Sequence, residues 1–178
     1  RRAAGPDVWV AECTGTNGPE GRLRAAIELR NPDWLGFTAT MAEIPAVMRL
    51  LQVAREVAPY LTCVLGGPHV TLLGASARRK GNARAVWAFL RLQARFDFVV
   101  LGDGEAAVFK TLRPRPMGTK VIDADQPGRE LFLSPADLDR APLPARDLID
   151  IQSYRYQLEG RQTMSLIGQL GCPFGCTF

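Results

Sequence analysis

Four short apolar runs divide the chain, and each has the length and residue types of a β-strand. They span residues 8–12, 34–38, 61–65 and 96–101. The last three are almost continuously apolar, which is typical of parallel strands covered on both faces.

Segments of helical length separate these runs. Residues 22–30 and 83–94 have weak helical periodicity, and residues 43–58 have a clear apolar side at helical spacing, formed by Ile44, Val47, Met48, Leu51 and Val57. Strands that alternate with helices predict right-handed crossovers and an α/β fold with a doubly wound parallel sheet of the Rossmann or flavodoxin-like type.

Small and polar residues follow three of the predicted strands at their carboxyl ends. These loops span residues 38–40, 66–71 and 102–105. Ligands of doubly wound sheets bind outside the carboxyl ends of the strands, so the loops predict a binding edge. Ordinary turn chemistry explains the same residue types, and the pattern alone leaves both interpretations open.

The pattern changes after residue 119. Two short apolar runs, 120–122 and 130–133, flank the sequence Asp-Gln-Pro-Gly-Arg and predict a hairpin. Residues 134–150 contain three prolines and predict an inter-domain connector, and residues 164–170 predict the first strand of a new unit.

Length and composition indicate one globular core with an appendage. The chain has 178 residues, of which 47% are hydrophobic and 22% are charged. Cys13 and Cys63 lie in or at the end of apolar runs and are expected to be small core residues. Because the sequence begins with Arg1 rather than Met, we expect a piece of a longer protein.

Charge and hydropathy argue against nucleic-acid and membrane partners. Lys and Arg outnumber Asp and Glu by 22 to 18, and the basic residues are scattered except at 78–80, which we interpret as a solvated surface loop. No run reaches the ~18 apolar residues that a membrane span needs, and Arg1-Arg2 is followed by Ala-Ala-Gly-Pro rather than by the apolar core of a secretion signal. The expected location is cytoplasmic.

Cys172 and Cys176 are the second candidate for chemistry. Pro173 and Gly175 between and beside them favour a loop over a helix, and thiolates on such a loop suit an iron–sulfur cluster. A zinc site usually needs four protein ligands, and the only histidine, His69, is far away in the sequence. Spacing alone does not decide between a metal site and two unrelated buried thiols.

Four motifs, in order, give the chain a family resemblance. Residues 64–71 and 96–105 are similar to paired motifs of a cobalamin-binding domain, and residues 137–148 are similar to the linker that follows it. Residues 171–178 resemble the start of the radical S-adenosylmethionine signature Cys-x3-Cys-x2-Cys, whose third cysteine would fall directly after Phe178. The chain therefore resembles cobalamin-binding radical S-adenosylmethionine (radical SAM) proteins, but it stops one residue short of that cysteine.

The resemblance implies three segments. Residues 1–117 would form a cobalamin-binding Rossmann-like domain without its first strand, because motif order matches residues 8–12 to the family's second strand. Residues 118–160 would form a hairpin and linker, and residues 161–178 would form the first strand and cysteine loop of a truncated partial TIM barrel of the radical SAM type. Because the missing strand would leave unpaired backbone on its neighbours, the isolated chain is expected to be poorly stable.

The resemblance also implies the ligands. Cys172 and Cys176 would bind a 4Fe-4S cluster that holds S-adenosylmethionine. His69 would line the corrin face rather than ligate cobalt, since Asp-x-His-x-x-Gly is absent around it, and Glu105 is expected to have mainly a structural role at a helix start. The residues implied for cobalamin binding are Thr38, Thr40, Gly66, Gly67, His69, Val70, Thr71, Gly102, Gly104 and Glu105.

The implied function is that of an enzyme. We expect a cobalamin-dependent radical SAM methyltransferase that generates a 5′-deoxyadenosyl radical and acts on a small biosynthetic substrate, with flavodoxin or ferredoxin as electron donor. Alternatives are a radical SAM cyclase or rearranging enzyme, a corrinoid carrier or sensor without radical chemistry, and a scaffold that has lost cobalamin. Catalytic residues are not assigned.

Overall fold

The computed structural model describes residues 7, 8, 10, 18–112, 117, 118, 120–150 and 156–164. Cys13, Cys172 and Cys176 lie outside these residues, as does nearly all of the predicted strands 8–12 and 164–170. The chain divides into two compact units, residues 11–142 and residues 1–10 with 143–178, which are described separately.

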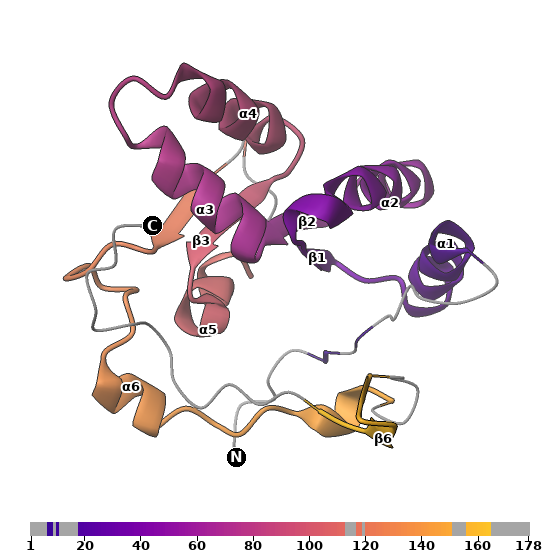
Figure 1. Cartoon of the computed structure of the whole chain (residues 1–178). Coiled ribbons are helices and arrows are strands. Elements are labelled where there is room, and N and C mark those ends of the chain that lie inside the picture. Colours follow the sequence, from indigo (N-terminus) through magenta and orange to yellow (C-terminus); the bar gives the residue numbers. More distant parts are fainter. Residues whose placement is uncertain are drawn as a thin grey trace, which may run out of the picture. The chain divides into compact units, whose positions relative to one another are not determined.

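A four-stranded parallel sheet organises the larger unit, with its strands in chain order (Figure 1). Three of the strands are those expected from the apolar runs, and the α/β fold with a parallel sheet is confirmed. The arrangement is compatible with a Rossmann-like fold. The strands are β1 (Trp34–Thr38), β2 (Thr62–Gly66), β3 (Phe98–Gly102) and β4 (Lys120–Ala124).

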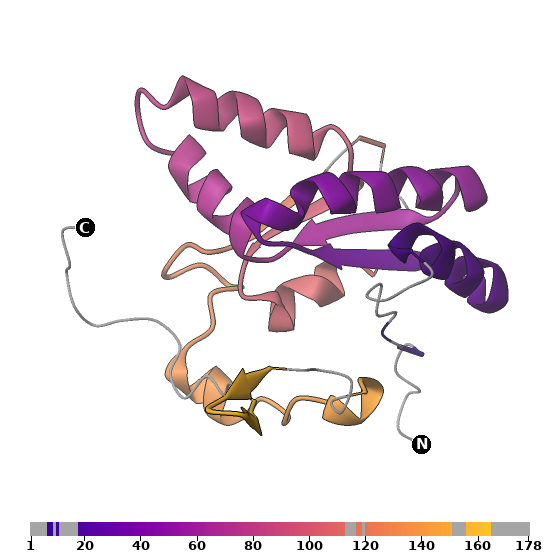
Figure 2. The ribbon, with the colours of Figure 1, turned by 45° about the vertical axis from the view of Figure 1, so that its right-hand side comes forward.

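Helices cover both faces of this sheet. In Figure 2, α2 to α4 lie on one side of the strands and the short α5 lies on the other, while α1 lies beside β1 and contributes Leu23 and Ile27 to the core under α2 to α4. The three helices predicted from periodicity are present, and α5 begins where a helix start was expected beside Glu105, whereas α3 and α6 were not predicted. The helices are α1 (Pro19–Arg30), α2 (Ile44–Val57), α3 (Pro68–Ala77), α4 (Ala83–Gln93), α5 (Gly104–Ala107) and the short α6 (Pro135–Asp139).

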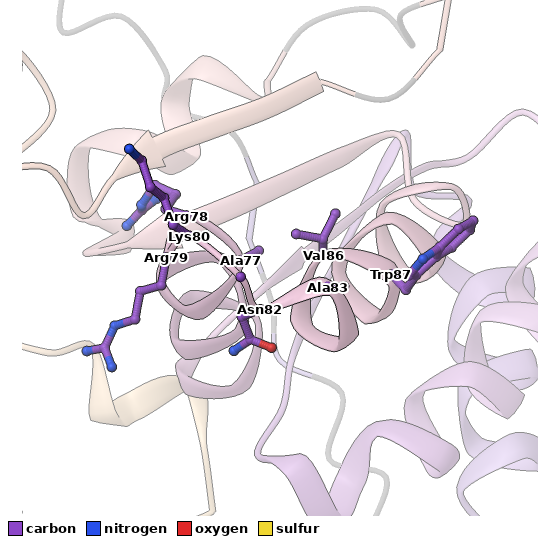
Figure 3. Close-up of a pocket in the computed structure, with 9 residues that line it drawn as sticks. Ala77, Arg78, Arg79, Lys80, Asn82, Ala83, Val86 and Trp87 are labelled. Atoms are coloured by element: carbon purple, nitrogen blue, oxygen red, sulfur yellow. The ribbon is translucent and has the colours of Figure 1, made fainter.

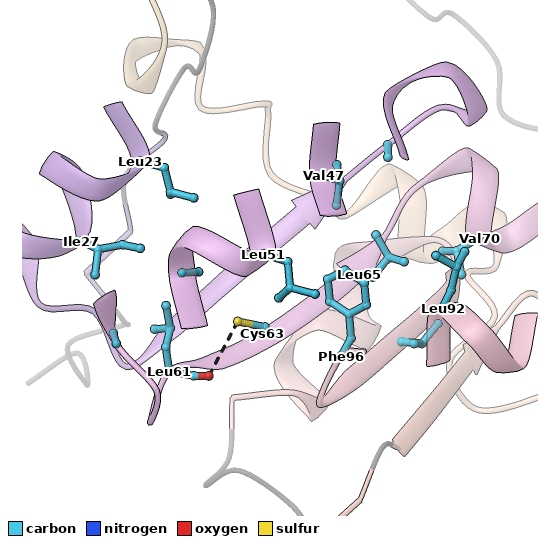
Figure 4. Packing of buried hydrophobic residues seen from close by; sticks show 14 of the residues in the cluster. Leu23, Ile27, Val47, Leu51, Leu61, Cys63, Leu65, Val70, Leu92 and Phe96 are labelled. Carbon is cyan, nitrogen blue, oxygen red and sulfur yellow. Dashed lines mark hydrogen bonds between the residues drawn. The ribbon is translucent and has the colours of Figure 1, made fainter. Parts of the chain in front are cut away.

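Side chains of the central strands point alternately to the two faces of the sheet, so they form two hydrophobic cores. Cys63, Leu65 and Val99 face the larger core under α2 to α4, which Figure 4 shows from close by. Val64 and Phe98 face a smaller core completed by Ala107 of α5. Cys63 is fully buried in the larger core and its thiol donates to the Leu61 carbonyl at 3.7 Å, which confirms its prediction as a core residue.

A buried carboxylate ties the amino ends of two strands to α2. The Oδ2 atom of Asp97 accepts hydrogen bonds from Nη2 of Arg55, at 2.6 Å, and from the backbone N–H of Cys63, at 2.8 Å. Nη1 of Arg55 donates to the carbonyl of Leu61 at 2.7 Å. These bonds hold the last turn of α2 against the start of the sheet.

The hairpin predicted at 120–133 is wrong. Residues Lys120–Ala124 form β4, which is parallel to β3 with Phe98 opposite Lys120, and residues 130–133 contain no strand. Turn bonds follow instead, from Arg129 N–H to the Gln126 carbonyl and from Phe132 N–H to the Arg129 carbonyl. The local sequence pattern correctly predicted a strand at 120–122. The strand pairs with β3 rather than with residues 130–133, because β3 has a free edge with unpaired backbone groups.

The prediction of strands covered on both faces is right for β2 and β3 and wrong for β1. The first four residues of β2 and β3 are buried, whereas Gly36 and Thr38 of β1 are exposed. Within the described residues β1 pairs only with β2, so it is an edge strand, and the four strands follow one another without a gap.

The described residues of the smaller unit contain one 3-10 turn and two short strands. A single 3-10 turn, η3, spans Arg146–Leu148, and the antiparallel strands β5 (Gln157–Leu158) and β6 (Arg161–Gln162) form a two-residue ladder. Among all the described residues, no helix has both the length and the apolar character that crossing a lipid bilayer requires.

Candidate functional site

The carboxyl ends of the four parallel strands meet along one edge of the sheet. Thr38 of β1 lies opposite Gly66 of β2, and Gly102 of β3 lies opposite Ala124 of β4. The three loops predicted to form a binding edge therefore follow adjacent strands, and the loop after β4 adds Asp125 to them.

Gly67 brings the loop after β2 against the end of β1. Its φ is +94°, and a Cβ on it would lie 2.5 Å from the Thr38 hydroxyl and 3.0 Å from the Ala39 nitrogen. The N–H of His69 donates to the Ala39 carbonyl at 3.2 Å. Only glycine fits at this position, and the approach places Thr38 and His69 on neighbouring loops.

Thr71 joins the loop after β2 to the loop after β3. Its hydroxyl donates to the Gly67 carbonyl and accepts from the Gly102 N–H, both at 3.0 Å. Gly102 has a φ of +80°, and a Cβ there would lie 2.6 Å from the backbone of Ala124 and Asp125. A single hydroxyl thus fixes two glycine loops, and the second loop lies against the end of β4.

Thr40 begins the short 3-10 turn η1 (Met41–Glu43) before α2. Oε2 of Glu43 accepts from the Thr40 N–H at 2.6 Å and from the Thr40 hydroxyl at 2.8 Å. Both hydrogen bonds lower the pKa of Glu43, and the bond from the backbone N–H has the larger effect. The Thr40 side chain is therefore already engaged in a capping box at the edge.

Acidic residues gather where β3 and β4 end. Partial burial raises the pKa of Asp103, and the nearby charges of Glu105 and Asp125 raise it further. Glu105 lies in the first turn of α5, as expected. The edge therefore has two hydroxyls and one capped carboxylate, that of Glu43, after β1, and a cluster of three carboxylates, those of Asp103, Glu105 and Asp125, after β3 and β4.

Arg78 partly balances that acidity. Its Nη1 atom lies 2.7 Å from Asp123, and its Nη2 atom lies 2.6 Å from Asp125. Arg78, Arg79 and Lys80 are all exposed, in agreement with the interpretation of residues 78–80 as a solvated surface loop, and the ion pairs of Arg78 were not foreseen. The sequence contained no local sign of this pairing, because the partners are more than forty residues apart.

The expected cofactor-binding residues differ in their access to a ligand. Thr38, Thr40, Gly104 and Glu105 are exposed, and Gly66, Gly67, His69, Thr71 and Gly102 are half-buried. Val70 is 0% exposed and lies in the larger core, so its side chain supports α3 from inside. Asp103 and Asp125 were not among the residues predicted for the site.

Cys172 and Cys176, the predicted metal ligands, lie outside the described residues. Within the described residues, no group of three or more His, Cys, Asp or Glu side chains is arranged to hold a metal ion.

Comparison with known proteins gives two distant relatives. The chain is 26% identical over 185 residues to the anaerobic magnesium-protoporphyrin IX monomethyl ester cyclase of Rubrivivax gelatinosus, covering 97% of the chain and 31% of that protein. It is 27% identical over 167 residues to an uncharacterised methyltransferase of Pyrococcus horikoshii, covering 83% of the chain and 31% of that protein. The chain thus spans about a third of the length of these relatives.

No family model matches the chain, and no solved structure has significant similarity to it.

Proposed function

We propose that this chain is the corrinoid-binding part of a longer cobalamin-dependent radical SAM enzyme. The observation that carries the proposal is the carboxyl edge of the sheet. There the Thr71 hydroxyl joins the glycine loops after β2 and β3, and Gly67 lies close against the end of β1. Similarity to a cyclase and to a methyltransferase, both about three times as long as the aligned region, supports an enzymatic role for the longer protein.

The residues present at the edge fit a broad, flat ligand. Glycine occupies four positions in the two central loops, namely Gly66, Gly67, Gly102 and Gly104. Gly67 and Gly102 have no room for a Cβ, whereas a Cβ added at Gly104 would have open space around it. A corrin ring needs such a surface, on which backbone approaches closely and few side chains protrude.

Individual side chains at the edge would orient the ligand. The Thr38 hydroxyl and the His69 imidazole stand on adjacent loops beside β1 and β2, where they can donate to or accept from the amide groups at the corrin periphery. Asp103 and Glu105 border the other side, where carboxylates accept from amide N–H groups. Bound cobalamin would supply a transferable methyl group.

The second cofactor site would lie on the cysteine loop. Cys172 and Cys176, with a third ligand, would hold a 4Fe-4S cluster and S-adenosylmethionine. A methyltransferase acting on a small biosynthetic substrate, reduced by a flavodoxin or ferredoxin, is the specific activity proposed. A radical SAM cyclase is the second candidate, because the Rubrivivax gelatinosus relative is named as a cyclase.

Corrinoid binding can be tested at Gly104. A Cβ added at Gly104 would have no atom within 4 Å apart from its chain neighbours and the backbone of its own helix, so the fold should accept leucine there, and the side chain would project from the proposed ligand surface. In an anaerobic titration with hydroxocobalamin followed by visible absorption, we expect Gly104→Leu to weaken binding by at least about tenfold, which equals a loss of about 1.4 kcal/mol.

Gly21→Leu is the matched control, because Gly21 lies in α1 and a Cβ added there would also have open space around it. It should bind hydroxocobalamin like the unchanged chain. If the unchanged chain takes up no corrinoid, or if both variants bind equally well, the proposed edge is not the corrinoid site.

Iron analysis separates an enzyme from a carrier. In the chain extended through the residue after Phe178 and reconstituted with iron and sulfide, about four irons per chain are expected. Corrinoid uptake without iron would favour a carrier or sensor, and uptake of neither would leave a doubly wound scaffold.

A further inference from the structure

The outward face of α4 is apolar where a surface helix is normally polar. Ala85 and Leu92 are buried on its inner side. On the opposite side, Trp87 is 69% exposed, Leu90 is 48% exposed and Val86 is 38% exposed. Together with the exposed Ala83, these residues follow the spacing i, i+3, i+4, i+7, which places them on one helical face.

The surroundings of this face are basic. Residues 78–96 contain six Arg or Lys residues and no Asp or Glu. Arg78 is paired with Asp123 and Asp125. In the part of the chain that the structure describes, the other five form no ion pair with a carboxylate; these are Arg79, Lys80, Arg84, Arg91 and Arg95.

A hollow of about 440 Å³ adjoins the apolar face at the start of α4. It is lined by Ala83, Val86 and Trp87 of the helix and by the preceding loop, from which Arg79 and Lys80 extend (Figure 3). The hollow is open enough to receive a protruding side chain, and cations stand at its border.

We propose that this surface, formed by Ala83, Val86, Trp87 and Leu90 with its basic border, binds an amphipathic helix of a partner protein whose apolar ridge is flanked by Asp and Glu. An apolar row at heptad-like spacing accepts the ridge of another helix, and Ala83 lets that helix approach closely. Trp and Arg are the residue types that most often dominate binding energy at protein interfaces.

Charge and shape select this partner over two others. A second copy of the chain would bring a basic surface against a basic surface, which is repulsive. A lipid bilayer is attracted by the positive charge but offers no protruding side chain for the hollow, whereas a helix does. Five of the six basic residues are arginine, whose planar fork pairs with carboxylates in a bidentate manner. The proposal does not depend on the corrinoid site.

The test uses a labelled synthetic amphipathic helix about three heptads long, with leucine on one side and glutamate at its flanks. In fluorescence anisotropy we expect the chain to bind this helix in low salt and more weakly as salt screens the charges. The same helix with lysine in place of glutamate should not bind.

Variants locate the binding surface. Trp87→Ser, and separately the double change Arg84→Glu with Arg91→Glu, should each weaken binding of the acidic helix by about tenfold or more. Leu29→Ser and Arg161→Glu are matched controls at exposed positions on α1 and β6, and they should bind as the unchanged chain does. Circular dichroism checks that each variant keeps its fold.

Three results would overturn the proposal. The acidic helix fails to bind, or binds all variants equally; Trp87 mediates binding to phosphatidylserine vesicles but not to the helix; or sedimentation shows that Trp87 drives self-association of the chain.

Discussion

Asp103, at the carboxyl edge, is a residue whose surroundings raise its pKa. Burial disfavours its charged form, and Glu105 and Asp125 add like charge nearby, so its pKa in the folded chain lies above the ordinary value of 3.8. None of these neighbours is a partner that stabilises the charge. The carboxyl therefore opposes folding once it is ionised.

The pH dependence of this effect follows from the direction of the shift. Below pH 3.8 the carboxyl is protonated in the folded and the unfolded chain, and it causes no difference in stability. As the pH rises through the raised pKa of the folded chain, the unfolded chain has already lost its proton, so the free energy of unfolding decreases. Above that pKa the loss is complete.

We expect Asp103→Asn to be more stable than the unchanged chain at neutral pH and about equally stable at acid pH, since asparagine does not ionise. Urea unfolding from about pH 3 to about pH 7 measures the difference. Glu105→Gln should make the advantage of the asparagine variant smaller, because one source of the shift is removed. An advantage that stays constant with pH would show that ionisation is not its cause.

Three loop glycines at the carboxyl edge differ in whether the fold requires them. Gly67 and Gly102 have positive φ and no room for a Cβ, whereas Gly104 has open space around it. The sequence marks all three as loop residues. Only the positions of Thr38 and Ala124 show which of them are required by the fold.

At the scale of elements, Asp97 connects three of them. It accepts from Arg55 at the end of α2 and from the N–H of Cys63 in β2, and it directly precedes β3. The Asp97 side chain is 7% exposed, so Arg55 would lose its partner in a largely dry environment if the carboxylate were removed.

Asp97→Ala is therefore expected to lower the free energy of unfolding by about 3 kcal/mol, the lower part of the range for breaking a buried pair, because Arg55 is partly exposed. Urea unfolding measures this change. Glu130→Ala removes the exposed pair with Lys110 and should leave the midpoint nearly unchanged. Equal effects of the two substitutions would contradict a structural role of the Asp97 bonds.

Helix α3 shows why some elements escaped prediction. Its sequence begins with Pro68 and contains Gly74, and its apolar residues do not fall on one narrow side. Gly74 lies where a Cβ would be 2.7 Å from the Leu101 side chain, so it allows α3 to lie close to β3. A residue that disfavours helix locally is required by packing between elements.

At the scale of the whole molecule, the sheet and both cores lie within the unit that ends at residue 142. We expect the chain truncated after Pro142 to keep the cooperative unfolding transition of the sheet. Truncation after Leu112 removes β4, uncovers the edge of β3 and deletes Ala124 from the smaller core.

Thermal unfolding followed by circular dichroism compares the two truncated chains. The shorter one should lose its transition or unfold at a markedly lower temperature. If both unfold alike, β4 does not contribute to the stability of the sheet.

The sequence by itself determined the alternation of strand and helix, three strands of the sheet and the three loops at its carboxyl edge. These features depend on periodicity and on glycine and proline, which act over a few residues. Thr38–Thr40, Gly66–Thr71 and Gly102–Glu105 were therefore found before the fold was known.

The tertiary structure decided which groups meet. It paired β4 with β3, placed Arg78 beside Asp123 and Asp125, buried Val70, and turned Trp87 outward. Each of these contacts joins groups that are far apart in the chain. They depend on three-dimensional geometry and burial, which local residue patterns do not contain.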